Sequence, residues 1–373
     1  MKKILLKLKH FSCSADLVFF CLFWLMVLLV FGTIAQRYIG LYQSQQYFFS
    51  SWFFWVGFIP LPSGSLVMSV LFIGLLSKLI FKSPWTKKRI GINVVHLGAM
   101  LLLFGGFLTS TFSEEGSMAI VEGETVSYVR DYHDKELVVI DVSQPKTEKV
   151  YAFQQGWLQK GKKLSLASLP FSMHVVESYT NCTLAKRKSD DDKEYHGLAK
   201  NFFFVPLPRE KEEEKNQACL SFLLENAEAA NNGIYSLVEE MPITQNISIK
   251  DVPYRFELRA KRTYLPFSIR LLDFEKKTYA ATEKAKSFSS RIVLSDGGIE
   301  QRYFIQMNQP LRYKGYTFYQ ASFVDGVDAQ TSVFAVVKNI GRIFPYLSSI
   351  IMCFGLLLHL LLQVPKLVKR GES

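Results

Sequence analysis

Residues 92–109 have the sequence INVVHLGAMLLLFGGFLT, an apolar run that contains one ionisable side chain, His96. A helix rises 1.5 Å per residue, so a run of this length can cross the hydrocarbon core of a bilayer. An ionisable ring inside a bilayer is costly and usually marks a functional site. This stretch therefore predicts both a membrane protein and its candidate site.

Other apolar runs extend this prediction to the whole chain. They occupy residues 17–35, 65–81 and 343–363, and nothing between 110 and 342 resembles them. We predict four transmembrane helices, three N-terminal (about 17–35, 65–81 and 92–109) and one C-terminal. No small-residue cleavage site follows the first run, so it is expected to stay as a signal anchor.

Basic residues gather at the helix ends that alternating helices would place on one side of the membrane. The clusters lie at 2–9, 82–89 and 366–370. The positive-inside rule predicts that these segments, and both termini, are cytoplasmic. Residues 36–64 and 111–342 are then extracytoplasmic, periplasmic for an inner-membrane protein or in the equivalent thylakoid compartment. Lys78, near the inner end of the second helix, can snorkel to the cytoplasmic surface.

The positive net charge of the chain also follows from these basic clusters beside the membrane helices. The formal net charge is +11, and residues 1–110 and 343–373 account for all of it, so the block 111–342 is neutral. The basic character therefore follows from membrane topology, and we expect a lipid bilayer and no nucleic acid as partner.

The block 111–342 is predicted to be a large extracytoplasmic β-rich domain, followed by the fourth helix and tail in 343–373. Alternating, β-branched and aromatic-rich runs recur in it. The predicted strands are 117–129, 136–142, 171–179, 201–205, 254–258, 267–274, 291–294 and 300–307, and 218–230 is predicted to be a short helix.

A short repeat suggests the internal organisation of this domain. The tetrad Leu-Pro-Phe-Ser occurs at 169–172 and again at 265–268, each time before an alternating run. We predict two related β-units packed together as a sandwich or partial barrel.

Five cysteines are present, and only Cys182 and Cys219 fall in this domain. No C-x-x-C motif occurs, which argues against thiol–disulfide exchange by this chain and against attachment of c-type haem to it. The sequence leaves open whether Cys182 and Cys219 are bridged.

An aromatic segment, YFFSSWFFWVGF at 47–58, follows the first helix and includes Trp52 and Trp55. Such residues are typical of the membrane interface, where they anchor a protein. The alternative is that Trp52 and Trp55 lie over a flat ring that leaves the membrane.

Four strings in order carry a family resemblance: NVVHLGAMLLLFGG, SMAIVEGETVSY, LPFSIRLLDFEKKTY, and IQMNQPLRYKGYTFYQASF at 305–323. With the arrangement of three helices before the domain and one after it, they resemble the ResB (CcsB) family of c-type cytochrome biogenesis, the System II route. The resemblance covers nearly the whole chain.

The resemblance implies a function in a membrane complex. ResB-like proteins pair with a CcsA/ResC-type membrane subunit, to which some are fused, and together they carry haem b across the membrane for attachment to apocytochrome c. This chain lacks the tryptophan-rich motif of that subunit, so it is expected to be a non-catalytic part of a haem lyase (holocytochrome c synthase) complex. Thiol-reducing proteins of the pathway are further expected partners.

The family's haem ligand in the third helix falls on His96, which is expected to bind the iron as an axial ligand. The alternative is a packing histidine that hydrogen-bonds to a neighbouring helix. His359 in the fourth helix lies at a similar predicted depth, about 9 Å from the cytoplasmic end. The second ligand is either His359 or, as the resemblance favours, a residue of the partner.

Glycines of the third helix define a second face. Gly98 and Gly105 are seven residues apart and share one side, from which His96 is turned by about 160°. We predict that the glycine face allows close approach of another helix. The face of His96 carries Ala99, Met100 and Leu103.

Two other functions remain open. The chain could be a structural assembly factor that binds no haem, whose β-rich domain docks the partner or apocytochrome, or it could transport another solute, although few polar residues line the helices. No catalytic triad, carboxylate pair or glycine-rich phosphate loop is evident, so no catalytic residue is predicted.

Overall fold

The computed structural model describes residues 13–144, 147–187, 194–241, 245–279, 285–326 and 329–371, with side chains as far as residue 364. The chain divides into two compact units. One combines Met1–Glu114 with Lys338–Ser373 and is mainly helical, and the other is Glu115–Val337 and is built of strands. We call them the helical unit and the β unit.

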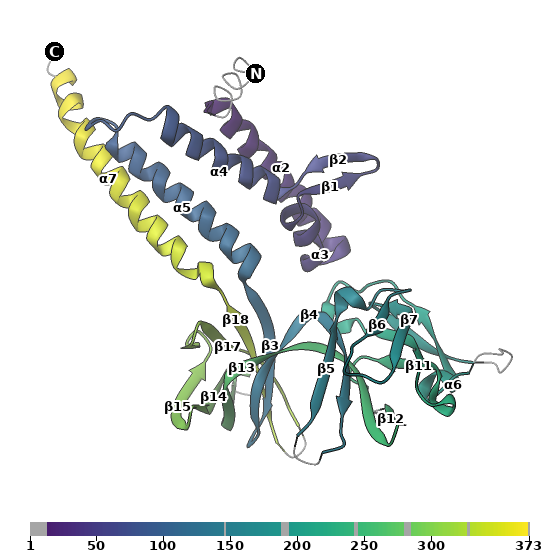
Figure 1. The fold of residues 1–373 in the computed structure, drawn as a ribbon. Coiled ribbons are helices and arrows are strands. Elements are labelled where there is room, and N and C mark those ends of the chain that lie inside the picture. The colour runs from purple at the N-terminus through teal and green to yellow at the C-terminus, as the bar shows by residue number, and fades with distance from the viewer. Residues whose placement is uncertain are drawn as a thin grey trace. The chain divides into compact units, whose positions relative to one another are not determined.

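The helical unit contains four helices that are long and apolar enough to cross a membrane, as predicted (Figure 1). Three precede the β unit and one follows it. They are α2 (Ala15–Ile39), α4 (Gly64–Phe81), α5 (Ile90–Phe112) and α7 (Phe344–Gly371), the last entered through the 3₁₀ turn η5 (Ile340–Ile343).

The segment between α2 and α4 is folded. It forms α3 (Leu41–Gln45), the π-helical turn η1 (Gln46–Ser50) and a hairpin of β1 (Phe53–Val56) and β2 (Ile59–Pro62). Gly57 permits the turn because its φ is +62°. The rings of Tyr47 and Phe48 pack on buried Phe54, with centroids 5.6 and 5.1 Å away.

Helices α5 and α7 pack antiparallel through a line of glycines. A Cβ atom added to Gly105 would lie 2.2 Å from Phe344 Cβ, and one added to Gly98 would lie 2.6 Å from Met352 Cγ. Such distances leave no room for a side chain, so the prediction that the glycine face admits another helix is confirmed, and that helix is α7. We call this contact the glycine seam.

The β unit is built mainly from a ten-stranded and a four-stranded sheet. The larger sheet has the order β15-β14-β13-β4-β3-β18-β17-β16, with β12 on β13 and β5 on β4, and the smaller one β11-β10-β7-β6. The strands of the larger sheet are β3 (Glu114–Val121), β4 (Thr125–Asp141), β5 (Lys149–Gln154), β12 (Gln245–Ile249), β13 (Val252–Thr278), β14 (Ala285–Asp296), β15 (Ile299–Gln306), β16 (Leu311–Tyr313), β17 (Tyr316–Val324) and β18 (Thr331–Lys338). Those of the smaller sheet are β6 (Lys163–Ser165), β7 (Ser172–Tyr179), β10 (Cys219–Glu225) and β11 (Gly233–Val238), and a separate hairpin pairs β8 (Cys182–Lys186) with β9 (Phe202–Pro206).

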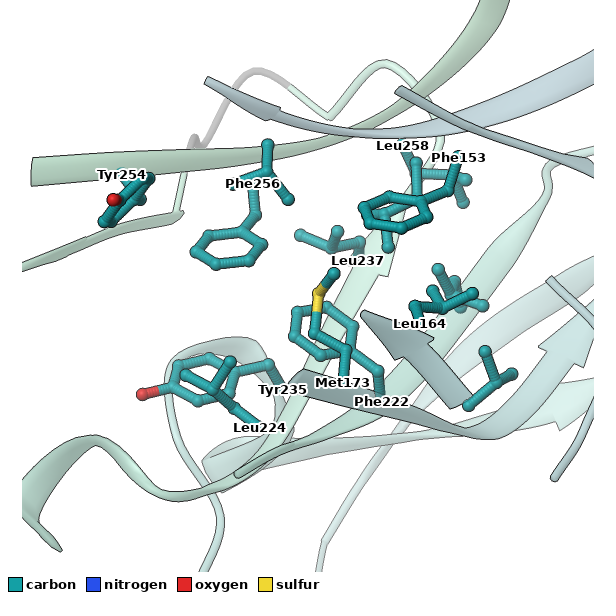
Figure 2. Packing of buried hydrophobic residues seen from close by; sticks show 14 of the residues in the cluster. Phe153, Leu164, Met173, Phe222, Leu224, Tyr235, Leu237, Tyr254, Phe256 and Leu258 are labelled. Carbon is teal, nitrogen blue, oxygen red and sulfur yellow. The ribbon is translucent and has the colours of Figure 1, made fainter. Parts of the chain in front are cut away.

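Two hydrophobic cores share the long strands β4 and β13. In the first, Phe222 stacks on Phe256 with ring centroids 5.5 Å apart (Figure 2). The second is built around Phe318 and Phe334. Leu137 of β4 belongs to the first core and Val129 to the second, so one strand contributes to both. We name them the Phe256 core and the Phe318 core.

The sequence repeat supplies both cores. Phe171 of the first Leu-Pro-Phe-Ser tetrad lies in the Phe256 core, and Phe267 of the second lies in the Phe318 core. Between them, β13 slips register against β4 after Ala260. A buried ion pair holds this crossing, with Arg259 Nε 3.0 Å from Glu136 Oε1.

Several sequence predictions are corrected. Most of residues 218–230, predicted to be helical, form strand β10 (Cys219–Glu225), because Leu220, Phe222 and Leu224 alternate into the Phe256 core, and a 3₁₀ turn follows at Ala229–Asn231. The predicted strand 117–129 is broken by a turn into β3 and β4, whereas 254–258 and 267–274 are parts of one strand, β13. The bridge between Cys182 and Cys219, which the sequence left open, is present and joins β8 to β10.

Candidate functional site

His96 lies on α5, six residues after the helix begins at Ile90, which is about 9 Å along the axis. The side chain is half-buried. Within the described part of the chain its imidazole makes no hydrogen bond and no ion pair. The ring is therefore available to a ligand.

The face of His96 is turned away from the glycine seam. Leu103 shares this face, one heptad further along α5, and it packs on a small apolar cluster of α2 and α4. The cluster consists of Cys21, Val67 and Leu71. His96 therefore belongs to the side of α5 that faces α2 and α4.

His359 occupies a different place. It packs in the glycine seam, where a Cβ added to Gly91 would lie 2.5 Å from His359 N. Its Nδ1 is buried and without a hydrogen-bond partner among the described residues. Gly91 precedes His96 by five residues, so the level of His359 differs from that of His96 by about 7.5 Å and the two faces by about 140°. The two rings are not brought together on α5, and the role of His359 as second ligand stays a prediction.

Trp52 and Trp55 belong to the aromatic hairpin between α2 and α4. Their side chains are 57% and 58% exposed, and Phe58 beside the turn is 97% exposed. Trp24 of α2, which the sequence analysis did not single out, donates from Nε1 to the Pro62 carbonyl oxygen over 2.8 Å and ties the hairpin to the helix. Both exposed tryptophans remain candidates for contact with lipid or with a bound ring.

Histidines of the β unit have structural partners. His174 Nε2 lies 3.0 Å from Glu225 Oε2, and His196 stacks on Tyr235. Burial lowers the pKa of His133 below its ordinary value. No group of three metal-ligating side chains occurs among the residues that the structure describes.

An arginine-lined pocket of about 250 Å³ lies where β4, β11 and β13 meet. Its cations are matched, since Arg130 pairs with Glu240 at 2.9 Å and Arg262 covers the Tyr128 ring at 4.4 Å. Sequence patterns did not indicate this pocket, because its residues come from distant strands. The ion pair and the ring contact explain the pocket as a structural junction.

The surroundings of His96 suit haem, the substrate that the family resemblance implies. A neutral imidazole can bind the iron. Beside it on the helix lie Ala99 and Met100, both half-buried, which present a small and a pliable side chain to a flat apolar ring. The donor and its apolar surroundings fit the group, whereas the seam face of α5 is filled by α7.

Two comparisons relate this chain to known proteins. The sequence model of the ResB-like family matches residues 227–337, within the β unit. Over 272 residues, or 71% of this chain, the sequence is 25% identical to Protein NrfI of Wolinella succinogenes. That stretch is 27% of the relative, so the chain spans about a quarter of its length. The two matches confirm the resemblance of this chain to the ResB family.

Proposed function

We propose that this chain is a haem-handling membrane subunit of c-type cytochrome biogenesis that acts with a CcsA/ResC-type subunit. One observation carries the proposal: an imidazole without a protein partner among the described residues lies in a helix that can cross a membrane, on the face opposite the glycine seam. The similarity to the ResB-like family supports it.

In this function haem b is the substrate, and His96 holds its iron through a neutral ring nitrogen. Few water molecules can compete for the iron in a transmembrane site, so the imidazole remains bound until another ligand replaces it. The second axial ligand comes from the partner subunit or from His359. The β unit then presents its surface to apocytochrome c.

The direction of transfer depends on topology. With both termini and the linker 82–89 in the cytoplasm, the β unit is periplasmic, or lies in the equivalent thylakoid compartment, and haem moves outward. Reporter fusions after Lys88 and near Glu210 test this arrangement. We expect a cytoplasmic signal at Lys88 and an exported one at Glu210, and a cytoplasmic signal at Glu210 would reverse the direction.

The haem ligand is tested by His96→Ala in the full chain. We expect loss of most of the haem that co-purifies with it, seen in the Soret band, while membrane insertion is retained. In His96→Gly, added imidazole should restore part of the band, because it fits the vacated space. His174→Ala in the β unit is the control and should keep wild-type haem. Full haem with an unchanged Soret spectrum in His96→Ala would contradict the assignment.

A second candidate function is a scaffold that binds no haem itself. In that function the β unit, part of which matches the family model, would dock the partner subunit or apocytochrome. The same experiment separates the two functions, because a scaffold would leave the haem content of the complex unchanged in His96→Ala.

A further inference from the structure

One lysine, Lys78, lies near the same end of the helix pair α4 and α5 as His96. Lys78 lies in the last turn of α4, three residues before the helix ends at Phe81, and is half-buried. The linker 82–89 connects α4 to α5, and the two helices run in opposite directions (Figure 1). Both Lys78 and His96 are therefore near the linker end of their helices.

Helical spacing places the two residues opposite each other. Leu71 of α4 belongs to the apolar cluster with Cys21 and Val67, and Leu103 of α5 packs against this cluster. Lys78 follows Leu71 by seven residues and His96 precedes Leu103 by seven. Seven residues return to nearly the same face, about 10.5 Å along the axis. One heptad from this cluster, towards the linker on each helix, leads to Lys78 on α4 and to His96 on α5.

The electrostatics agree with this spacing. Among the described residues, Lys78 lies close enough for its charge to act on the His96 ring. The acids of the helical unit within the described residues are Asp16, at the start of α2, and Glu114, which pairs with Lys338 at 3.5 Å. Neither of these acids forms an ion pair with Lys78. A cation in a membrane helix needs an anion or access to water.

We propose that Lys78 binds a propionate carboxylate of the haem whose iron is held by His96. The inference rests on the proposed function. Haem has an apolar ring, a central iron and carboxylates along one edge, so a flat molecule held by His96 can place that edge against an ammonium group on the facing helix. An ammonium–carboxylate hydrogen bond is among the stronger contacts available to Lys.

The same geometry orients the ring. Lys78 lies about 4.5 Å from the linker end of α4, and His96 about 9 Å from the linker end of α5. The propionate edge therefore points to the linker, and the opposite edge lies deeper among apolar side chains.

The test compares two ligands in the full-length chain purified in detergent: ferric haem, and its dimethyl ester, which lacks the carboxylates. Soret titration gives the affinity for each. For Lys78→Gln we expect haem affinity to fall about tenfold or more, as for loss of a charge-assisted hydrogen bond, and ester affinity to stay unchanged. Lys78→Arg should retain most of the haem affinity. Exposed Lys82 provides the control variant, Lys82→Gln, which should bind both ligands like the wild type.

Two outcomes overturn the inference. Equal haem affinity in Lys78→Gln and wild type would mean that Lys78 only anchors α4 at the membrane surface. An equal fall for haem and ester would mean a general change in structure. His96→Ala is measured in parallel and should weaken both ligands. If His96→Ala weakens both and Lys78→Gln neither, the inference fails and the proposed function stands, whereas no effect of His96→Ala removes the function itself.

Discussion

The two units of this chain differ in the size of the residues that form their tightest contacts. In the helical unit, small residues such as Gly98 and Gly105 form the tight contact, while large side chains such as Phe58 are left outside. In the β unit, Phe222 and Phe256 are almost completely buried. Lipid is as apolar as leucine, so a membrane helix gains from close backbone approach, whereas water drives large rings inward.

The largest effect on stability is expected when a substitution introduces a large side chain into the glycine seam. Gly105→Leu would place a Cβ atom 2.2 Å from Phe344 Cβ, which is bonded directly to the backbone and cannot move aside without separating α5 from α7. We expect little stable full-length protein, measured by thermal unfolding and protease resistance in detergent.

Gly106 provides the matched control for this substitution. A Cβ there meets nothing within 4 Å, so Gly106→Leu should insert and unfold like the wild type. Equal loss of stability in the two variants would mean that helix α5 tolerates no leucine at all, and that the seam is not the cause.

A second prediction compares phenylalanines of the two units. Phe256→Ala removes a ring from the Phe256 core and should lower the free energy of unfolding by about 4 kcal/mol. Phe58→Ala, in the hairpin of the helical unit, should change it by less than about 0.5 kcal/mol. Denaturant unfolding followed by near-ultraviolet circular dichroism measures both. Similar effects would show that burial does not distinguish the two rings.

The disulfide should have an intermediate effect in the β unit. The bridge closes a loop of 37 residues between Cys182 and Cys219. Replacing both by Ser should lower the free energy of unfolding by about 3 kcal/mol, and reduction of the wild type should do the same. Cys353→Ser, at a free and exposed thiol of α7, is the control and should be neutral. Unchanged stability of the reduced wild type would remove the bridge as a stabilising feature.

The smallest effect is expected from His359→Ala. The ring lies in the seam, away from the face of His96, so we expect haem affinity to fall less than about threefold when the partner supplies the second ligand. Soret titration beside His96→Ala measures this. An equal loss in the two variants would mean that both axial ligands come from this chain.

Sequence alone predicted the membrane helices and the contact between two of them, because lipid surroundings demand long apolar runs and small residues at helix contacts. Four apolar runs gave four helices, and the spacing of Gly98 and Gly105 gave the seam. Strand β10 was missed, because Ala and Glu on its C-terminal side favour helix while its alternate residues fit the Phe256 core. The continuity of β4 and β13 was missed as well, since both cores that they join are formed by distant strands.

The candidate site was predictable only in part. His96 was recognised because a ring in an apolar run is exceptional, whereas Lys78 was interpreted as a snorkelling side chain. The position of Lys78 relative to His96 depends on how α4 and α5 are rotated about their axes, and composition does not encode this rotation. Trp24 was missed for the same reason, since its bond to Pro62 joins two segments whose packing is tertiary.

The β unit begins and ends on neighbouring strands, because β3 and β18 lie side by side in the larger sheet. This arrangement has a consequence for the order of folding. Bringing α7 to α5 across a flexible chain as long as residues 115–337 would cost about 5 kcal/mol in loop entropy. Once the β unit has folded, its two ends are adjacent, and the loop to be closed is only a few residues long. The seam should therefore form after the β unit, and a short turn in place of 115–337 should leave α5 and α7 able to pair.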